Sequence, residues 1–207
     1  MTKKPHYWNK GKVFLSNKDE VLKDIIHKYS KEHLNLNSNY YYALINSIIG
    51  QQISVSAAQS VKKKFFKSNK NTTPKKLLKI NSHTLKKTGL SKQKVKYIKN
   101  ISSFFIENKE FIKHISTYDE DIIREKMITI KGVGNWTIDM FLIFSLGKSN
   151  IFPTGDLGFN KAISKLYKKK LPLKDRYLAN LYKLWSPYSS MATWYLWRSL
   201  DPEPINY

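Results

Sequence analysis

Apolar residues recur at helical spacing along nearly the whole chain, and this periodicity limits the possible folds more than any other feature of the sequence. Three apolar stripes are the clearest: residues 21–29 after Ser16 and Asn17, residues 55–65 after Ser54, and residues 95–105 after Ser91. Positions three and four apart share one helix face, and Ser or Asn side chains commonly cap a first turn. No alternating run between turn dipeptides indicates a strand. We therefore predict an all-α fold.

Further helical segments follow the same spacing. They are expected near residues 40–49, 75–88, 119–127, 135–146, 157–169, 174–184 and 188–200. The turn over residues 147–150 and the loop Pro153-Thr154-Gly155 interrupt the series. We predict two helical lobes with a cleft between them. The expected divisions are an N-terminal helix in residues 1–39 that packs on the C-terminal lobe, a central lobe over 40–150 with two helices joined by a hairpin (helix-hairpin-helix) near 119–147, and a C-terminal lobe over 151–207.

Composition excludes several kinds of site. Cysteine is absent from the 207 residues, so disulfides, zinc–thiolate sites and iron–sulfur clusters are excluded. The five histidines form no His-x-x-x-His pair, and there is no phosphate-binding loop or dinucleotide fingerprint. We therefore expect no cofactor and no catalytic metal.

The sequence shows no sign of membrane insertion or export. No apolar run approaches the roughly 20 residues that span a bilayer. The N-terminal residues also lack the apolar stretch of a signal peptide. We expect a monomer without a membrane partner that is cytoplasmic and nucleoid-associated, or nuclear in a eukaryote.

The charge is strongly positive. The chain has 37 Lys and Arg against 15 Asp and Glu, a formal net charge of +22. Such a field attracts polyanions and favours nonspecific binding of nucleic acid. Lysine accompanied by many Asn, Ile and Tyr residues is also what an AT-rich coding sequence produces. The positions of the lysines therefore matter more than their number.

A Gly-x-Gly turn, Gly132-Val133-Gly134, lies between two apolar helical stripes. A turn of this kind brings bare backbone N–H groups to the start of a helix. Unpaired donors and the positive end of the helix dipole attract an anion there. A glycine after a helix is more often a simple C-terminal cap. The helices on both sides favour a phosphate-binding hairpin.

Asp156 follows one predicted helix later, at the end of Phe152-Pro153-Thr154-Gly155. Two interpretations are open. An Asp before a helical stripe commonly caps the helix. A carboxylate at a lobe junction can instead face a cleft, where ligand sites commonly form.

Several separated motifs resemble the helix-hairpin-helix (HhH-GPD) DNA glycosylase superfamily, and within it the AlkA-like 3-methyladenine DNA glycosylases II. They are Gly50-Gln51-Gln52-Ile53-Ser54, Gly89-Leu90-Ser91 with Lys94, the stretch 128–162, and Trp185-Ser186-Pro187-Tyr188 through Trp197. The resemblance covers about residues 40–200. It implies the helix-hairpin-helix glycosylase fold. The implied function is a monofunctional enzyme of base excision repair that flips alkylated purines, such as 3-methyladenine, out of double-stranded DNA and hydrolyses their N-glycosidic bond.

The resemblance also assigns roles within the active site. Asp156 is the catalytic carboxylate, because bond cleavage passes through an oxocarbenium-like sugar that a negative charge stabilises. Trp136, Met140 and Trp197 bind the base, since electron-poor purines stack on aromatic rings. Bifunctional relatives place a Schiff-base lysine where this chain has Trp136, so no lyase activity is expected. Packing in the core remains the alternative for Trp197.

The remaining implied contacts are with DNA and with a cation. Gln51 and Gln52 match the segment that fills the gap left by a flipped base. Residues matching the DNA-binding hairpin are Lys131, Gly132, Val133, Gly134 and Thr137. The carbonyl groups of Ile128, Ile130 and Val133 match those that hold a sodium or potassium ion in the family.

Two departures from the family pattern leave the substrate range open. Met140 stands where the broad-specificity bacterial enzyme has a second pocket tyrosine, and the separate N-terminal domain of longer members has no counterpart. Two other functions therefore remain as alternatives. One is a noncatalytic protein that binds DNA structures through the hairpin. The other is a glycosylase for oxidised or mismatched bases.

Overall fold

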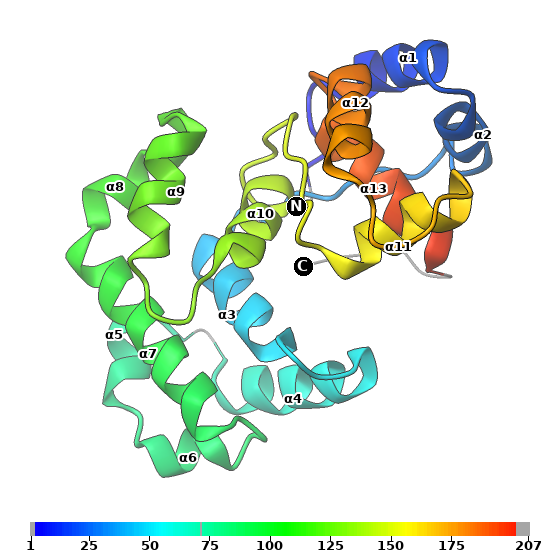
Figure 1. Ribbon diagram of the computed structural model, residues 1–207. Helices are drawn as coiled ribbons and strands as arrows, with labels where there is room; N and C mark the ends of the chain where they lie inside the picture. The colour runs from blue at the N-terminus through cyan, green and yellow to red at the C-terminus, as the bar shows by residue number, and fades with distance from the viewer. Residues whose placement is uncertain (1–2, 71, 202–207) are drawn as a thin grey trace. The chain divides into compact units, whose positions relative to one another are not determined.

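The computed structural model describes residues 3–70 and 72–201, and the regular structure of this part of the chain is almost entirely helical (Figure 1). It contains thirteen α-helices and one 3-10 helix. The only β-type pairing within the described residues is an isolated bridge between Lys3 and Leu36. The predicted all-α class is confirmed. No helix in the described part is long and apolar enough to cross a membrane.

The helices group into two compact units. The first unit combines the described residues of 1–38 and 142–207, and the second is Asn39–Phe141. Helices of the first unit are α1 (Trp8–Lys18), α2 (Glu20–Lys28), α11 (Leu157–Leu166), α12 (Asp175–Trp185) and α13 (Ser189–Leu200). Those of the second are α3 (Tyr40–Gly50), α4 (Val55–Ser68), α5 (Pro74–Lys79), α6 (Ser82–Lys86), α7 (Lys92–Glu107), α8 (Lys109–Lys113), the 3-10 helix η1 (Ile115–Thr117) and α9 (Glu120–Ile128). Helix α10 (Asn135–Phe144) begins in the second unit, and its last residues belong to the first.

These divisions differ from the expected ones. The boundary falls after Phe141, inside α10, and not in the loop after residue 150. Residues 3–38 hold two helices where one was expected. Both α1 and α2 pack against α13, so this segment belongs to the same unit as the C-terminal helices.

The core of the first unit is built around α13. Every residue of α13 from Ser189 to Arg198 is buried. Trp8 of α1 meets Trp194 edge to face, with ring centroids 5.3 Å apart. Aromatic pairs in this arrangement stabilise a core beyond the area they bury.

Asp19 joins three helices of the first unit. Its side chain caps α2 by accepting a hydrogen bond from the N–H of Leu22 (3.1 Å). The same buried carboxylate accepts hydrogen bonds from Tyr167 Oη and Trp185 Nε1, both at 2.8 Å. Burial and the nearby Asp19 carboxylate raise the pKa of Tyr167 above its usual value. The expected cap at Ser16 and Asn17 is wrong, because those two residues lie inside α1.

Local caps define several helices of the second unit. Ser54 accepts from the N–H of Ala57 and Ser91 from the N–H of Lys94, which confirms the predicted starts of α4 and α7. The single helix expected over 75–88 is instead the pair α5 and α6. Asn81 separates them by accepting from the N–H of His83 at 2.8 Å. Helices α1 and α8 were not predicted.

Helix α7 forms the centre of the second unit. It packs against α3, α5 and α6. Val95, Ile98, Ile101 and Phe104 form its buried face, at the spacing expected of one helix stripe. Lys92, Lys96 and Lys99 lie outside this buried face. Asn100 of α7 donates to the carbonyl oxygen of Lys131, in the turn between α9 and α10.

Candidate functional site

The predicted hairpin is the turn over residues 129–134, between α9 and α10. Its two glycines have different roles. Gly132 has a φ of +105°, which L side chains rarely adopt, and a Cβ atom built there would overlap the ring of Tyr97 on α7. Gly134 has no positive φ, and a Cβ atom at this position would meet nothing within 4 Å. The close turn therefore depends on Gly132 and not on Gly134.

Side chains from two other elements brace the hairpin. Gln51, at the end of α3, donates from Nε2 to the carbonyl oxygen of Gly132 (3.2 Å) and to Thr137 Oγ1 (3.1 Å). Asn100 of α7 donates from Nδ2 to the carbonyl oxygen of Lys131 (3.0 Å). The hairpin is thereby fixed to α3 and α7 before any ligand binds.

A third contact ties α7 to α3. Lys94 Nζ donates to the carbonyl oxygen of Ile49 at 2.8 Å. Burial lowers the pKa of this ammonium group. Side-chain to backbone hydrogen bonds therefore connect the hairpin, the end of α3 and α7 to one another.

Three of the residues expected to contact DNA make contacts within the protein, and their contacts with DNA stay predictions. Gln51 donates two side-chain hydrogen bonds to the hairpin, both through Nε2. Thr137 is only 1% exposed, and its hydroxyl faces Gln51. Val133 is buried, and its N–H donates to the carbonyl oxygen of Ile130 at 2.9 Å. These residues shape the hairpin from within.

Other expected contacts are accessible. Lys131 and Gly134 are exposed, and so is Gln52, which adopts a left-handed φ of +56°. The N–H groups in the first turn of α10 have no acceptor within their own helix. The hairpin can therefore present backbone donors and one lysine to an anion.

A hollow of about 530 Å³ opens beside the hairpin within the second unit. Gln52, Gln93, Tyr97 and Trp136 are among the residues that line it. Trp136 lies half-buried in the first turn of α10, while Met140 is only 2% exposed. Of these two expected base-binding residues, Trp136 alone lines this hollow.

Asp156 lies in the first unit and caps α11. Its Oδ1 accepts from the N–H of Phe159 at 2.6 Å, so the capping interpretation is confirmed. The same oxygen accepts from Trp197 Nε1 at 2.8 Å. Two donors from separate helices fix the orientation of this half-buried carboxylate.

Trp197 belongs largely to the core of the first unit. Its ring stacks on Phe144, with centroids 5.8 Å apart and planes 15° apart, and the residue is only 6% exposed. Gly158 leaves room for the approach, since a Cβ there would lie 3.2 Å from Asp156 Oδ1 and 3.5 Å from the indole ring. The indole therefore holds the carboxylate and offers little face to a base.

The cation site that the resemblance implies at three hairpin carbonyl groups stays a prediction, and the structure shows the hydrogen-bond partners of the hairpin carbonyl groups. Those of Lys131 and Gly132 already accept side-chain amide hydrogen bonds. No side-chain amide bond to the carbonyl groups of Ile128, Ile130 or Val133 is found within the described residues, and the carbonyl oxygen of Ile130 accepts from the N–H of Val133 at 2.9 Å. Neutral oxygens of this kind suit a hard cation. The described part of the chain contains no cluster of three His, Cys, Asp or Glu side chains that could hold another metal.

A family model described as HhH-GPD superfamily base excision DNA repair protein matches residues 45–187. The chain belongs to this superfamily. The match includes the hairpin, the braces from α3 and α7, and Asp156.

Two curated relatives in the superfamily are similar over most of this chain. The putative DNA-3-methyladenine glycosylase YfjP of Bacillus subtilis is 30% identical over 189 residues, which are 87% of this chain and 66% of the relative. The DNA-3-methyladenine glycosylase 1 of Schizosaccharomyces pombe is 28% identical over 201 residues, which are 92% of this chain and 86% of the relative. The chain thus spans about two thirds of the first relative.

A solved structure has the same fold. It is the 3-methyladenine DNA glycosylase of Schizosaccharomyces pombe in complex with abasic DNA, with a TM-score of 0.80 and 24% identity. The alignment covers 96% of this chain and all of that one. The predicted helix-hairpin-helix glycosylase fold is confirmed.

Sequence reasoning missed the residues that support this superfamily hairpin. Asn100 and its partner Lys131 are 31 positions apart, and Gln51 and Gly132 are 81 apart. No local pattern marks such pairs. The motifs that contain Gln51 and Lys94 resemble those of the family, and this resemblance was the available signal. It did not reveal that the two side chains contact the backbone of other elements.

Proposed function

We propose that this superfamily member is a monofunctional DNA glycosylase that acts as a monomer on double-stranded DNA. It removes alkylated purines of the 3-methyladenine type and leaves an abasic site. The observation that carries the proposal is the carboxylate of Asp156, held by Phe159 N–H and Trp197 Nε1 in a base excision repair fold. The names of the curated relatives support the choice of lesion.

DNA is held through the hairpin. The backbone N–H groups near Gly132 and Gly134 and the exposed ammonium group of Lys131 bind phosphate oxygens. Contacts of this kind position a protein on the duplex without reading its sequence. The rigid bracing by Gln51 and Asn100 reduces the ordering that binding requires.

Base flipping needs one group to fill the stack and another to receive the base. Gln52 fills the gap, because it is exposed while the amide of Gln51 holds the hairpin. Trp136 stacks on the base. Stacking on an aromatic face is worth about 1–3 kcal/mol per base, and a positive charge on an alkylated purine adds a cation–π attraction.

Cleavage then depends on Asp156. As the bond between the sugar C1′ and the base nitrogen breaks, its electron pair leaves with the base and positive charge develops on the sugar. The fixed carboxylate stabilises that charge more strongly in the transition state than in the substrate. Water adds to C1′ and loses a proton. Trp136 has no amine for an attack on the sugar, so no covalent adduct forms.

The substitution Asp156→Asn tests the role of the carboxylate. Asn keeps an oxygen that can accept from Phe159 N–H and Trp197 Nε1, and it is itself a good N-cap. We expect release of methylated purines under single-turnover conditions to fall by on the order of 10²-fold or more, because an interaction made mainly in the transition state is lost. Asp175→Asn, at the exposed start of α12, is the matched control and should release bases at the parent rate.

The same assay separates the alternatives. A noncatalytic DNA-binding protein would release no base from any substrate. A glycosylase for oxidised or mismatched bases would act on duplexes that carry those lesions and spare methylated ones. Borohydride added during turnover should trap no protein–DNA adduct, and a trapped adduct would contradict the monofunctional assignment.

A further inference from the structure

Three lysines of α7 share one helix face and meet a fourth lysine on the hairpin. Lys92, Lys96 and Lys99 are spaced at i, i+4 and i+7, which places them on one side of a helix. Together with Lys131 they line a surface hollow of about 830 Å³ that also includes Tyr97 and Asn100. We call these four residues the lysine row.

The positive charge of the row is not balanced by nearby carboxylates. No acidic residue lines its hollow. Within the described residues, none of the four lysines forms an ion pair, whereas other basic side chains do: Lys23, Lys113, Arg124 and Arg198. Lys92, Lys96 and Lys131 are exposed, and Lys99 is half-buried. Like charges so placed repel one another, and a bound polyanion would relieve that repulsion.

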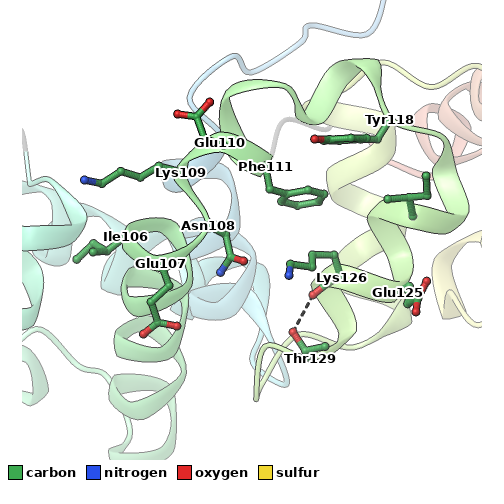
Figure 2. A pocket seen from close by; sticks show the side chains of 11 residues that line it. Ile106, Glu107, Asn108, Lys109, Glu110, Phe111, Tyr118, Glu125, Lys126 and Thr129 are labelled. Carbon is green, nitrogen blue, oxygen red and sulfur yellow. Dashed lines mark hydrogen bonds between the residues drawn. The ribbon is translucent and has the colours of Figure 1, made fainter.

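A second hollow nearby, of about 850 Å³, has a different character (Figure 2). It lies where α7, α8 and α9 meet, and Phe111 and Tyr118 stack on each other inside it, with centroids 5.2 Å apart. Glu107, Glu110 and Glu125 line it together with two lysines. This mixture of charges does not favour a polyanion, which leaves the lysine row as the more suitable surface.

The row is fixed to the hairpin. Asn100 follows Lys99 on α7 and donates to the carbonyl oxygen of Lys131 at 3.0 Å. Tyr97, between Lys96 and Lys99, packs its ring against Gly132. The cations of α7 therefore keep a constant position relative to the backbone donors of the hairpin.

We propose that the lysine row is a second phosphate-binding site, which extends the DNA contact from the hairpin along α7. The seven residue steps of helix from Lys92 to Lys99 rise about 10 Å. One strand of B-form DNA carries a phosphate for each 3.4 Å of rise, so this length spans about three phosphates. The row binds the backbone of undamaged and damaged duplex alike. This inference rests on the proposed DNA-binding role of the hairpin and extends it to α7.

The test replaces the three α7 lysines in the full chain, as Lys92→Gln, Lys96→Gln and Lys99→Gln. Binding to an undamaged duplex is measured by fluorescence anisotropy over a series of salt concentrations. Each neutralised phosphate contributes about 0.9 to the slope of log affinity against log salt. We expect the slope to lose about 2 to 3 units and the affinity at moderate salt to fall by about tenfold or more.

The matched control removes the same charge from the first unit, as Lys165→Gln, Lys168→Gln and Lys170→Gln. These lysines are exposed and form no ion pair within the described residues. Lys169 stays in place, because it lies over the ring of Tyr177. We expect the control to change the slope by less than about one unit. Equal slopes for the two triple variants would overturn the inference.

A second readout separates this inference from the proposed function. Release of methylated purines at saturating DNA should proceed in the α7 triple variant at the parent rate, because the row touches no reacting atom. If the parent protein released no base while the slope still fell in the α7 variant alone, the second phosphate site would stand and the glycosylase assignment would fail. If the parent released bases but the two triple variants had equal slopes, the glycosylase assignment would stand and the second phosphate site would fail.

Discussion

The hairpin of the second unit and Asp156 of the first are held by different kinds of interaction. The hairpin depends on backbone geometry: the positive φ of Gly132, the ring of Tyr97 packed against it, and amide side chains that bind carbonyl groups. Asp156 is one side chain whose Oδ1 receives two donors. The first arrangement offers several weak donors to a ligand, and the second offers one oriented charge.

This difference indicates a division between binding and chemistry. Loss of one phosphate contact among several lowers the affinity for DNA and leaves the reacting atoms unchanged. Loss of the single carboxylate removes a transition-state interaction and leaves most of the binding surface intact. Substitutions in the two regions should therefore change different measured quantities.

The largest effect among variants that leave the carboxylate intact is expected at Gly132. Gly132→Ala forces a Cβ into the ring of Tyr97 at a φ of +105°. Strained backbone of this kind costs about 1–3 kcal/mol. We expect that loss in the free energy of unfolding by urea, together with weaker binding to every duplex.

Gly134→Ala is the control for the hairpin. Its Cβ meets nothing within 4 Å, and its φ is not positive, so the loss of stability should stay below about 0.5 kcal/mol. Equal effects of the two substitutions would contradict the different roles assigned to the two glycines.

A smaller effect is expected at Trp197. Trp197→Phe removes the N–H that Asp156 accepts and keeps an aromatic ring beside Phe144. One hydrogen bond to a charged group is worth about 1.5 kcal/mol, so base release should slow about tenfold at unchanged DNA affinity.

The control on the same helix is Trp194→Phe, which removes the same atoms from a core residue that is 1% exposed. It should reduce thermal stability without slowing release in the folded protein. If Trp194→Phe slowed release as much as Trp197→Phe, the effect would come from packing of α13 and not from the Asp156 contact.

The smallest effect is expected at Asn100. Asn100→Ala removes the hydrogen bond to the carbonyl oxygen of Lys131 and loosens the hairpin from α7. The net value of such a bond is about 1 kcal/mol, which corresponds to a few-fold loss of DNA affinity. The rate of base release at saturating DNA should not change. A change in that rate with unaltered affinity would show that the brace acts on the chemistry.

The sequence was sufficient where the decisive partner is local. Ser54 and Ser91 cap helices through N–H groups three residues ahead, and both caps were predicted. Asp156 caps α11 in the same way. Such a hydrogen bond joins a side-chain oxygen to an N–H group three residues ahead, so residue type and spacing identify it.

The sequence was insufficient where the partner is distant. The cap of α2 was predicted at Ser16 and Asn17, but it is Asp19. Asp19 also accepts hydrogen bonds from Tyr167 and Trp185, which are 148 and 166 residues away. Gln51 was expected to contact DNA, but its partner Gly132 lies 81 residues away. The unit boundary was misplaced because α10 continues through it without a break.

The central claim is that chemistry depends on Asp156 and binding on the hairpin. The most direct measurement determines both DNA affinity and the single-turnover rate of base release for Asp156→Asn and Gly132→Ala on one duplex that contains 3-methyladenine. We predict that Asp156→Asn binds within about twofold of the parent and releases the base on the order of 10²-fold more slowly. Gly132→Ala should bind more weakly and, at saturating DNA, release the base at nearly the parent rate. A folded Asp156→Asn protein that released 3-methyladenine at close to the parent rate would contradict the account.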